Sequence, residues 1–376
     1  MENKVRVIID SPVKNADIIY SSGFYCHDPF VFIDTGENKI GFLPSTEIEK
    51  AKVKSSIDIF YNMTDELKRI KEAGNLPPLK SSLVIIYLNE INVHDIFVPE
   101  SFPYIEAENL KNHGINIFTY QDPFYQQRIS KTKDEIEIVR DNCSKNNQVM
   151  NKVKEILQNS SISNDRVLIY KGEILTVEKL QNIIYKAFVD YRLYTDTIIT
   201  AIGDQGVFPH ESGHGEVKAD TSIIVDIYPR SRDNLYYTDM TRTFCKGKAS
   251  NDLKKVYKAV LDAQRFAMDK IRANIKGSFI HELVSEYFAN KGFGTGILNG
   301  VLQGFFHGTG HGLGLDCHEM PYISSYGNEL PVNSIVSVEP GLYYIGSACV
   351  RIEDLVVVTE NGIENLTNYE KFLESE

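Results

Sequence analysis

A run rich in histidine and glycine, from His307 to Glu319, constrains the fold of this chain more than any other segment. It contains three of the chain's nine histidines and four glycines. Glycine permits backbone conformations that other residues resist and lets backbones or ligands approach closely. The run is therefore a poor helix, and its apolar flanks, Phe305-Phe306 and Leu313-Gly314-Leu315, favour a buried strand or turn. We interpret it as the wall of a metal or catalytic site rather than a flexible surface loop.

Two predicted strand pairs each present two carboxylates, and His311 lies between the pairs in sequence. The acids and their predicted strands are Asp226 in 222–228, Asp239 in 236–244, Glu339 at the end of 334–339 and Glu353 in 350–358. Converging carboxylates repel one another unless a counter-charge is present. Four carboxylates and one imidazole exceed the needs of a single structural zinc and suit two divalent ions bridged by carboxylates. The alternative is a set of separate salt bridges to Arg242 and Arg351.

Composition and charge favour a soluble globular protein and argue against one that binds nucleic acids or membranes over its whole surface. The chain has 376 residues, 42% of them hydrophobic and 24% charged, as in soluble globular proteins of two or three domains. The net charge of −11 argues against a general nucleic-acid or anionic-membrane surface. Five scattered cysteines form no Cys-x-x-Cys pair, so a reducing cytoplasm is the expected location. Neither a signal peptide nor a membrane span is predicted.

The first 125 residues predict a small α/β domain without a catalytic constellation. Its predicted elements are strands over 30–34, 39–43, 82–88 and 115–120 and helices over 64–73 and 101–113. The run 82–88 is almost continuously apolar, which is typical of a strand buried on both faces. A linker is expected within 121–130. Beyond it, helices are predicted over 133–158, 175–191, 251–275 and 278–291, and the acid-bearing strands alternate with them.

The ordered motifs resemble the creatinase, prolidase and aminopeptidase P branch of the pita-bread metallopeptidases. They are Asp226, Asp239-Met-Thr-Arg-Thr-Phe244, Gly310-His-Gly-Leu-Gly-Leu-Asp-Cys-His-Glu-Met-Pro321, Val338-Glu-Pro-Gly341 and Val350-Arg-Ile-Glu-Asp354. This ordered set, within 133–376, is far more specific than any single motif. The resemblance implies an α/β chain of two domains: a small N-terminal α/β domain over 1–125 and a catalytic pita-bread α+β domain over 126–376. The metal site would lie between two pseudo-symmetric halves of the second domain.

The resemblance also implies a role for each site residue. The implied metal ligands are Asp226, Asp239, His311, Glu339 and Glu353. The implied catalytic groups are Glu339 as proton shuttle, His318 at the scissile peptide and His210 at the tetrahedral intermediate. His307 and Arg351 would support the ligands, and Tyr322 would lie at the substrate rim. The implied cofactor is two divalent ions, Mn²⁺ or Co²⁺ first and Zn²⁺ or Fe²⁺ as alternatives, which would lower the pKa of a water molecule toward neutrality.

The activity implied by the resemblance is hydrolysis of the Xaa-Pro bond in dipeptides or short peptides, as in a prolidase. An Xaa-Pro aminopeptidase is the alternative, because Tyr322 brings no positive charge to a substrate carboxylate. The added N-terminal domain and the motif contexts disfavour methionine aminopeptidase, and the complete ligand set disfavours a metal-free creatinase-type hydrolase. A peptide-binding module without catalysis is the alternative from another class. The expected partners are a short proline-containing peptide and a second copy of the chain in a homodimer.

Overall fold

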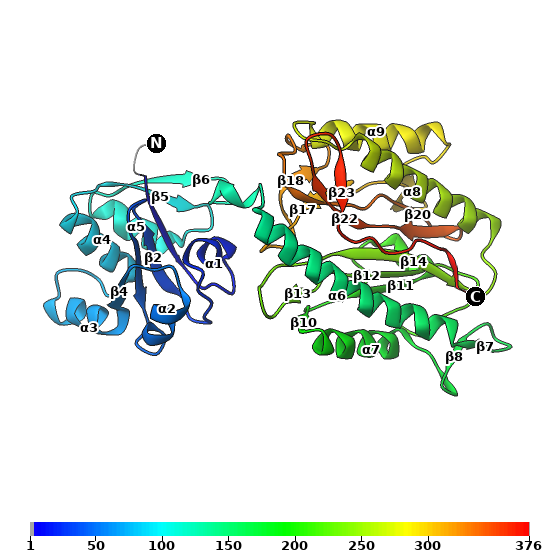
Figure 1. Cartoon of the computed structure of the whole chain (residues 1–376), viewed down its shortest axis with the longest axis horizontal. Coiled ribbons are helices and arrows are strands. Elements are labelled where there is room, and N and C mark those ends of the chain that lie inside the picture. Colours follow the sequence, from blue (N-terminus) through cyan, green and yellow to red (C-terminus); the bar gives the residue numbers. More distant parts are fainter. Residues whose placement is uncertain (1–3, 376) are drawn as a thin grey trace. The chain divides into compact units, whose positions relative to one another are not determined.

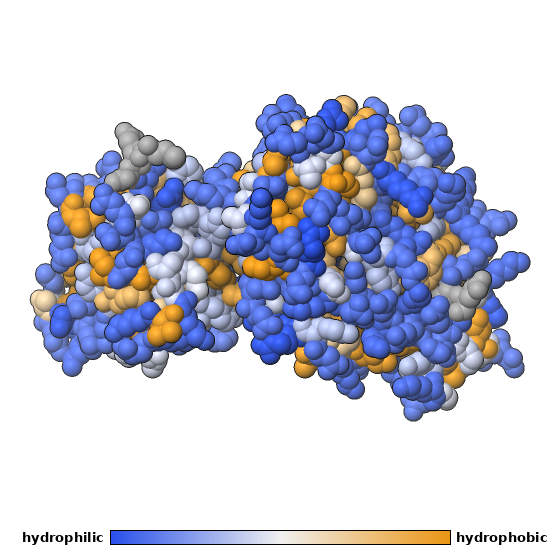
Figure 2. Space-filling view, viewed as in Figure 1, coloured by the Kyte–Doolittle hydropathy of each residue, from blue (hydrophilic) through white to orange (hydrophobic). Residues whose placement is uncertain are grey.

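A computed structural model describes residues 4–375 of the chain (Figure 1). Clustering of contacts divides the chain into two units, Met1–Arg128 and Ile129–Glu376. The visible face of each unit is largely hydrophilic, with hydrophobic residues in separate patches (Figure 2). Among the described residues, no helix is long and apolar enough to cross a membrane. Each unit has its own buried core.

The first unit is a six-stranded mixed sheet in the order β4-β3-β2-β1-β5-β6. Its strands are β1 Val5–Asp10, β2 Phe30–Asp34, β3 Lys39–Leu43, β4 Ile59–Asn62, β5 Asp95–Pro99 and β6 Asn116–Tyr120. Its helices are α1 Ala16–Ser22, α2 Ile48–Lys54, α3 Met63–Ala73, α4 Lys80–Glu90, α5 Tyr104–Asn112 and the short 3₁₀ helix η1 Gln126–Arg128. Alternate residues of β1 enter different cores, Val7 and Ile9 on one face and Ile8 on the other. Both faces of the sheet are therefore covered.

The strand predicted over 82–88 is wrong, because this segment lies inside helix α4. The helix has 11 residues, and Leu83, Val84, Ile85, Tyr87 and Leu88 are all buried in it. A short continuous apolar run does not distinguish a buried strand from a buried helix by periodicity. Here the helix is covered on most of its circumference, so its sequence lacks the polar stripe that would have identified it.

The second unit consists of two halves, each a sheet covered by a pair of helices. Helices α6 Lys133–Gln158 and α7 Val177–Asp190 cover the sheet β11-β12-β14-β24, and α8 Asn251–Lys270 and α9 Gly277–Asn290 cover β18-β17-β19-β22-β23. In Figure 1, α8 and α9 lie along the upper edge of this unit and α7 along its lower edge, with β12, β14 and β22 between them. The helices therefore form the outside and the strands the inside.

The strands of the second unit fall into the two main sheets and several small ones. The sheet under α6 and α7 has β11 Ile199–Ile202, β12 Ile223–Ile227, β14 Met240–Lys246 and β24 Glu374–Ser375. The sheet under α8 and α9 has β17 Gly310–Gly312, β18 Glu319–Ile323, β19 Ile335–Val338, β22 Asp354–Val358 and β23 Ile363–Asn365. The small sheets have β7 Ser161–Ile162, β8 Leu168–Tyr170, β9 Glu173–Ile174, β10 Leu193–Tyr194, β13 Arg230–Ser231, β15 Gly296–Leu298, β16 Val301–Gln303, β20 Gly341–Tyr344 and β21 Ala348–Arg351. A 3₁₀ helix, η2 Gly203–Val207, follows β11.

Side-chain caps explain where three of the long helices begin. The Thr132 side chain accepts a hydrogen bond from the Glu135 N–H, and the Glu135 side chain accepts one from the Thr132 N–H. Thr176 caps α7 and Ser250 caps α8 in the same way as Thr132. Such caps satisfy N–H groups that have no partner in the first turn. The helix predicted over 251–275 ends earlier, because the residue after Lys270 has extended backbone.

Two of the four candidate acids, Asp239 and Glu353, lie just outside strands and not inside them as predicted, whereas Glu339 comes at the end of its strand as predicted. Asp239 precedes β14, Glu339 follows β19, and Glu353 lies in a break between β21 and β22. The single strand predicted over 350–358 is therefore two strands. The reason is that β21 pairs with β20 whereas β22 pairs with β19, so the chain changes sheets at the break.

Candidate metal centre

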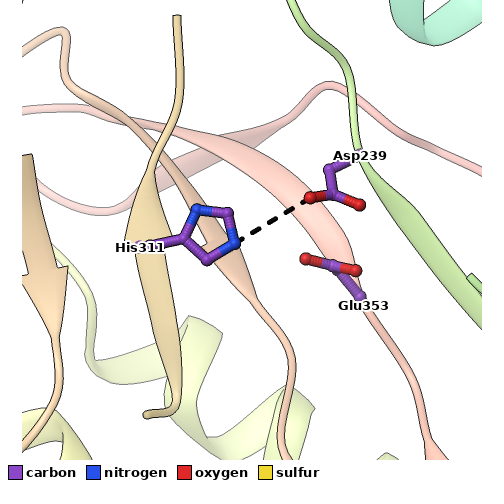
Figure 3. Close-up of side chains that lie close together, drawn as sticks. All are labelled: Asp239, His311 and Glu353. Atoms are coloured by element: carbon purple, nitrogen blue, oxygen red, sulfur yellow. Dashed lines mark ion pairs between the residues drawn. The ribbon is translucent and has the colours of Figure 1, made fainter. Parts of the chain in front are cut away.

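Asp239, His311 and Glu353 converge from three segments that are far apart in sequence. Each offers one ligand atom, and these atoms all lie within 4.8 Å of one another. Figure 3 shows the three side chains pointing toward one another, with the imidazole opposite the two carboxylates. The His311 Nε2 atom lies 3.8 Å from Asp239 Oδ2 and 3.5 Å from Glu339 Oε1. Four of the five predicted ligands are thus in one cluster.

The protonation of His311 suits a metal ligand. Its Nδ1 atom lies 3.0 Å from the Gly312 carbonyl oxygen, which can only accept, so Nδ1 carries the proton. Burial lowers the pKa of His311 below its ordinary value, so the ring is neutral at pH 7. The unprotonated Nε2 therefore turns its lone pair toward the carboxyl groups of Asp239 and Glu339. A cation among these groups would satisfy all of them.

The carboxylate oxygens fit a cation as well. Asp226 Oδ1, Asp239 Oδ1 and Glu353 Oε1 are buried and have no hydrogen-bond partner among the described residues. Burial, reinforced by the neighbouring acids, raises the pKa of Asp239 and of Glu353 well above ordinary values. Buried charges are normally paired or bound to metals. Carboxylate oxygens and one imidazole nitrogen form a donor set suited to divalent first-row cations.

Separate salt bridges, the alternative explanation of the acids, account for only one of the four. Arg351 Nη2 lies 2.7 Å from Asp226 Oδ2, and both side chains are buried. The other candidate cation, Arg242, pairs instead with Asp354 at 2.7 Å. Asp239, Glu339 and Glu353 therefore form no ion pair with a lysine or arginine among the described residues.

His307, Tyr343 and Arg351 form a chain of hydrogen bonds that ends at Asp226. Arg351 Nη1 donates to Tyr343 Oη at 3.0 Å, and the tyrosine hydroxyl lies 2.8 Å from His307 Nε2. Because arginine only donates, the tyrosine proton is free to point at Nε2, and His307 Nδ1 donates to the Gly308 carbonyl at 2.7 Å. Burial and the Arg351 charge lower the pKa of His307 to about 3. His307 is therefore neutral and orients Arg351, and through it Asp226.

We expect Tyr343→Phe to lower the free energy of unfolding by about 1–2 kcal/mol, because it leaves buried groups of His307 and Arg351 unpaired. Urea unfolding measures the change. The matched control is Tyr344→Phe, since the half-buried Tyr344 donates to a single peptide carbonyl, that of Gly294, at 2.9 Å, in a hydrogen bond that solvent can reach. That control should change stability by less than about 0.5 kcal/mol. Equal losses in the two variants would contradict the hydrogen-bond chain.

The three predicted catalytic residues lie around the cluster. Burial raises the pKa of Glu339 to about 7, against the opposing charge of Arg351. The ring of His318 lies 4.2 Å from that of His311, centroid to centroid, and burial lowers the pKa of His318 to about 4. His210 is exposed and lies near both Glu339 and His318. Tyr322, the predicted rim residue, lies on β18 with its ring 5.9 Å from that of Tyr326.

Several residues that support the site were not predicted from the sequence. The Thr241 hydroxyl donates to Glu353 Oε2 at 2.8 Å. Lys131 and Glu319 form a buried ion pair at 2.6 Å directly beside His318. Lys131 carries no sequence signal, because it lies at the end of a segment expected to be a linker. In the sequence, Tyr343 is only an aromatic residue in a strand, and nothing near it reveals that its hydroxyl binds His307 and Arg351.

Comparisons with known proteins agree with this geometry. The sequence model that defines metallopeptidase family M24 matches residues 137–360, more than half of the chain. The Xaa-Pro dipeptidase of Pyrococcus furiosus is 28% identical, covering 99% of this chain and 96% of the relative. An uncharacterised peptidase of Staphylococcus haemolyticus is 31% identical, covering 80% of this chain and 83% of the relative.

Solved structures show the same fold along the whole chain. An X-Pro aminopeptidase from Thermotoga maritima superposes with a TM-score of 0.80 at 21% identity, covering 100% of this chain and 98% of that one. The prolidase from Pyrococcus furiosus superposes with a TM-score of 0.77 at 23% identity, covering 98% and 97%. The predicted family and the predicted α/β fold, with a small first domain and a pita-bread second domain, are confirmed. The chain is a member of metallopeptidase family M24 and a hydrolytic metalloenzyme.

Proposed function

We propose that the protein is a metal-dependent Xaa-Pro dipeptidase that hydrolyses the bond before proline in dipeptides or short peptides. The observation that carries the proposal is the convergence of Asp239, His311 and Glu353 with buried carboxylate oxygens that lack donors. The specificity is supported by relatives named Xaa-Pro dipeptidase that align with nearly the whole chain. The amide nitrogen of an Xaa-Pro bond carries no proton, so peptidases that hydrogen-bond this N–H handle it badly. A pocket dedicated to the proline ring is therefore needed.

The proposed site holds two divalent ions, and their identity as Mn²⁺ or Co²⁺ stays a prediction. Asp226, Asp239, His311, Glu339 and Glu353 would hold the ions. When bound, such ions lower the pKa of water and polarise the substrate carbonyl. The buried acids of the cluster, whose proximity to one another helps raise the pKa of Asp239, and the neutral imidazole of His311 support this assignment.

Side chains of the chain would carry out the proton transfers and hold the substrate carbonyl and the ligand Asp226 in place. Glu339 would take a proton from the attacking water and deliver it to the proline nitrogen, which must be protonated to leave. A carboxylate in this position can accept a proton and then donate it. His318 and His210 would hydrogen-bond the carbonyl oxygen as charge develops on it. Arg351 would hold Asp226 in place through their 2.7 Å ion pair.

The length of the substrate is the sharpest test of this proposal. A dipeptidase must bind the carboxylate directly after proline, so we expect kcat/KM for Ala-Pro to exceed that for Ala-Pro-Ala and for Ala-Pro amide. The loss of a hydrogen bond to a charged group is worth roughly 1.5–3 kcal/mol, or about ten- to a hundredfold. Equal cleavage of the tripeptide would identify an Xaa-Pro aminopeptidase. That alternative is favoured by Tyr322, which offers a neutral hydroxyl at the position after Pro321.

Other parts of the proposal rest on the amino-acid sequence and the family resemblance. The homodimer and the cytoplasmic location stay predictions. The domain assignment, an N-terminal domain over 1–125 and a catalytic domain over 126–376, also stays a prediction. All the residues to which we assign roles in catalysis lie in the second of these ranges, so the proposal gives the first one no part in the chemistry.

A further inference from the structure

Gln264 is a polar side chain on the buried stripe of helix α8. Its neighbours on the stripe include Val260, Ala263 and Ala267, and Gln264 itself is 0% exposed. Burying an amide costs free energy unless it finds hydrogen-bond partners. The residue therefore needs a specific reason to be there, and its partners supply one.

The Gln264 amide binds the two peptide groups that precede Glu339 and Glu353. Its Nε2 donates to the Val338 carbonyl at 2.9 Å and to the Ile352 carbonyl at 3.2 Å. Both partners can only accept, so the amide must present its NH₂ group to them. Its Oε1 atom is buried and has no partner among the described residues. The NH₂ group is therefore the part of the side chain that the structure uses.

The same two peptide groups are also held at their N–H ends. The Glu339 N–H donates to the Thr309 carbonyl at 2.8 Å, and the Glu353 N–H donates to the Thr241 carbonyl at 3.0 Å. A peptide group is planar, so bonds at both of its ends fix its orientation and the direction in which the next residue starts. Gln264 is the anchor that the two peptide groups share.

We propose that Gln264 is a positioning residue, which holds Glu339 and Glu353 at the separation that shared cations require. Metal ligands must be held to about 0.5 Å by the groups around them. Helix α8 carries none of the proposed ligands, so this role is additional to the site described above. The inference rests on the proposed metal site.

The test is Gln264→Met in the full chain, because methionine has nearly the same shape and no NH₂ group. Mn²⁺ binding is followed by the electron paramagnetic resonance signal of the free ion. We expect the dissociation constant of at least one Mn²⁺ to rise about tenfold or more, since two buried carbonyls lose their donor. With saturating Mn²⁺, kcat for Ala-Pro should fall while KM changes little.

The matched control is Val260→Ala, one turn earlier on the same buried stripe. It should lower the melting temperature by leaving a cavity, but leave Mn²⁺ affinity unchanged. If Gln264→Met does not fold, Gln264→Asn carries the same expectation, because its shorter amide cannot reach both carbonyls.

Equal Mn²⁺ affinity in Gln264→Met and wild type, or an equal loss in Val260→Ala, would overturn the positioning role alone. A wild-type chain that binds no Mn²⁺ would overturn the proposed function together with it.

Discussion

Replacing Asp239 by asparagine is expected to lower kcat/KM for Ala-Pro by at least about a thousandfold. Asparagine has the same size, but it lacks the charge that the cluster offers to a cation. A metal ion contributes several kcal/mol of transition-state stabilisation, and each 1.4 kcal/mol is a factor of ten in rate. Steady-state kinetics with Mn²⁺ in excess measures the loss, and elemental analysis of the same sample shows whether metal content falls with it.

The control for this variant is Asp354→Asn, a buried acid next to Glu353. Although Asp354 is buried, Arg242 and Lys371 hold its pKa below the ordinary value. The variant should therefore lower the melting temperature, because it leaves Arg242 without its charge partner, yet keep the metal content of wild type. A folded Asp239→Asn variant with wild-type activity would remove Asp239 from the site.

Stripping the metal is expected to abolish activity and to lower the melting temperature by roughly 5–10 °C at pH 7.5. A ligand that binds only the folded state stabilises it by about 2.7 kcal/mol at a hundredfold excess over its dissociation constant. For a domain of this size, each kcal/mol corresponds to about 2–4 °C. Calorimetry before and after chelation, with metal removal verified by elemental analysis, measures the shift.

The same shift should shrink as the pH falls toward 5. In the metal-free protein, burial and mutual repulsion raise the pKa values of Asp239 and Glu353, and that of Glu339 reaches about 7. The folded state then binds protons that the unfolded state releases above about pH 4, so metal-free stability falls as the pH rises through the raised values. Acid protonates these groups and removes their repulsion. The same loss of stability at pH 5 and pH 7.5 would contradict this account.

Local sequence signals predicted the catalytic unit well where the determining contacts are themselves local. The helix predicted over 133–158 rests on apolar residues that recur at helical spacing within the segment itself, and it is confirmed in full. The strand predicted from the apolar run 82–88 was wrong because the determining contacts of that segment are not local. Its helical state depends on what covers α4, and the run itself does not reveal that.

The ligand-bearing motifs could be found because metal chemistry demands particular side chains in a particular order. Their support could not be found in this way, since it depends on contacts between distant segments. Gln264 reaches carbonyls 74 and 88 residues away, and Lys131 reaches Glu319 across 188 residues. A polar residue on the apolar stripe of α8 was the one available clue.

The division of the proposed ligands between the two halves has a consequence for how the second unit unfolds. Asp226 and Asp239 belong to the half covered by α6 and α7, whereas His311, Glu339 and Glu353 belong to the half covered by α8 and α9. Neither half contains the complete set of proposed ligands, so bound cations would be held by ligands from both halves. Opening of either core then exposes the cation and costs its whole binding energy. Metal binding should therefore merge two folding subunits into a single cooperative one, with slow amide exchange in both cores at once.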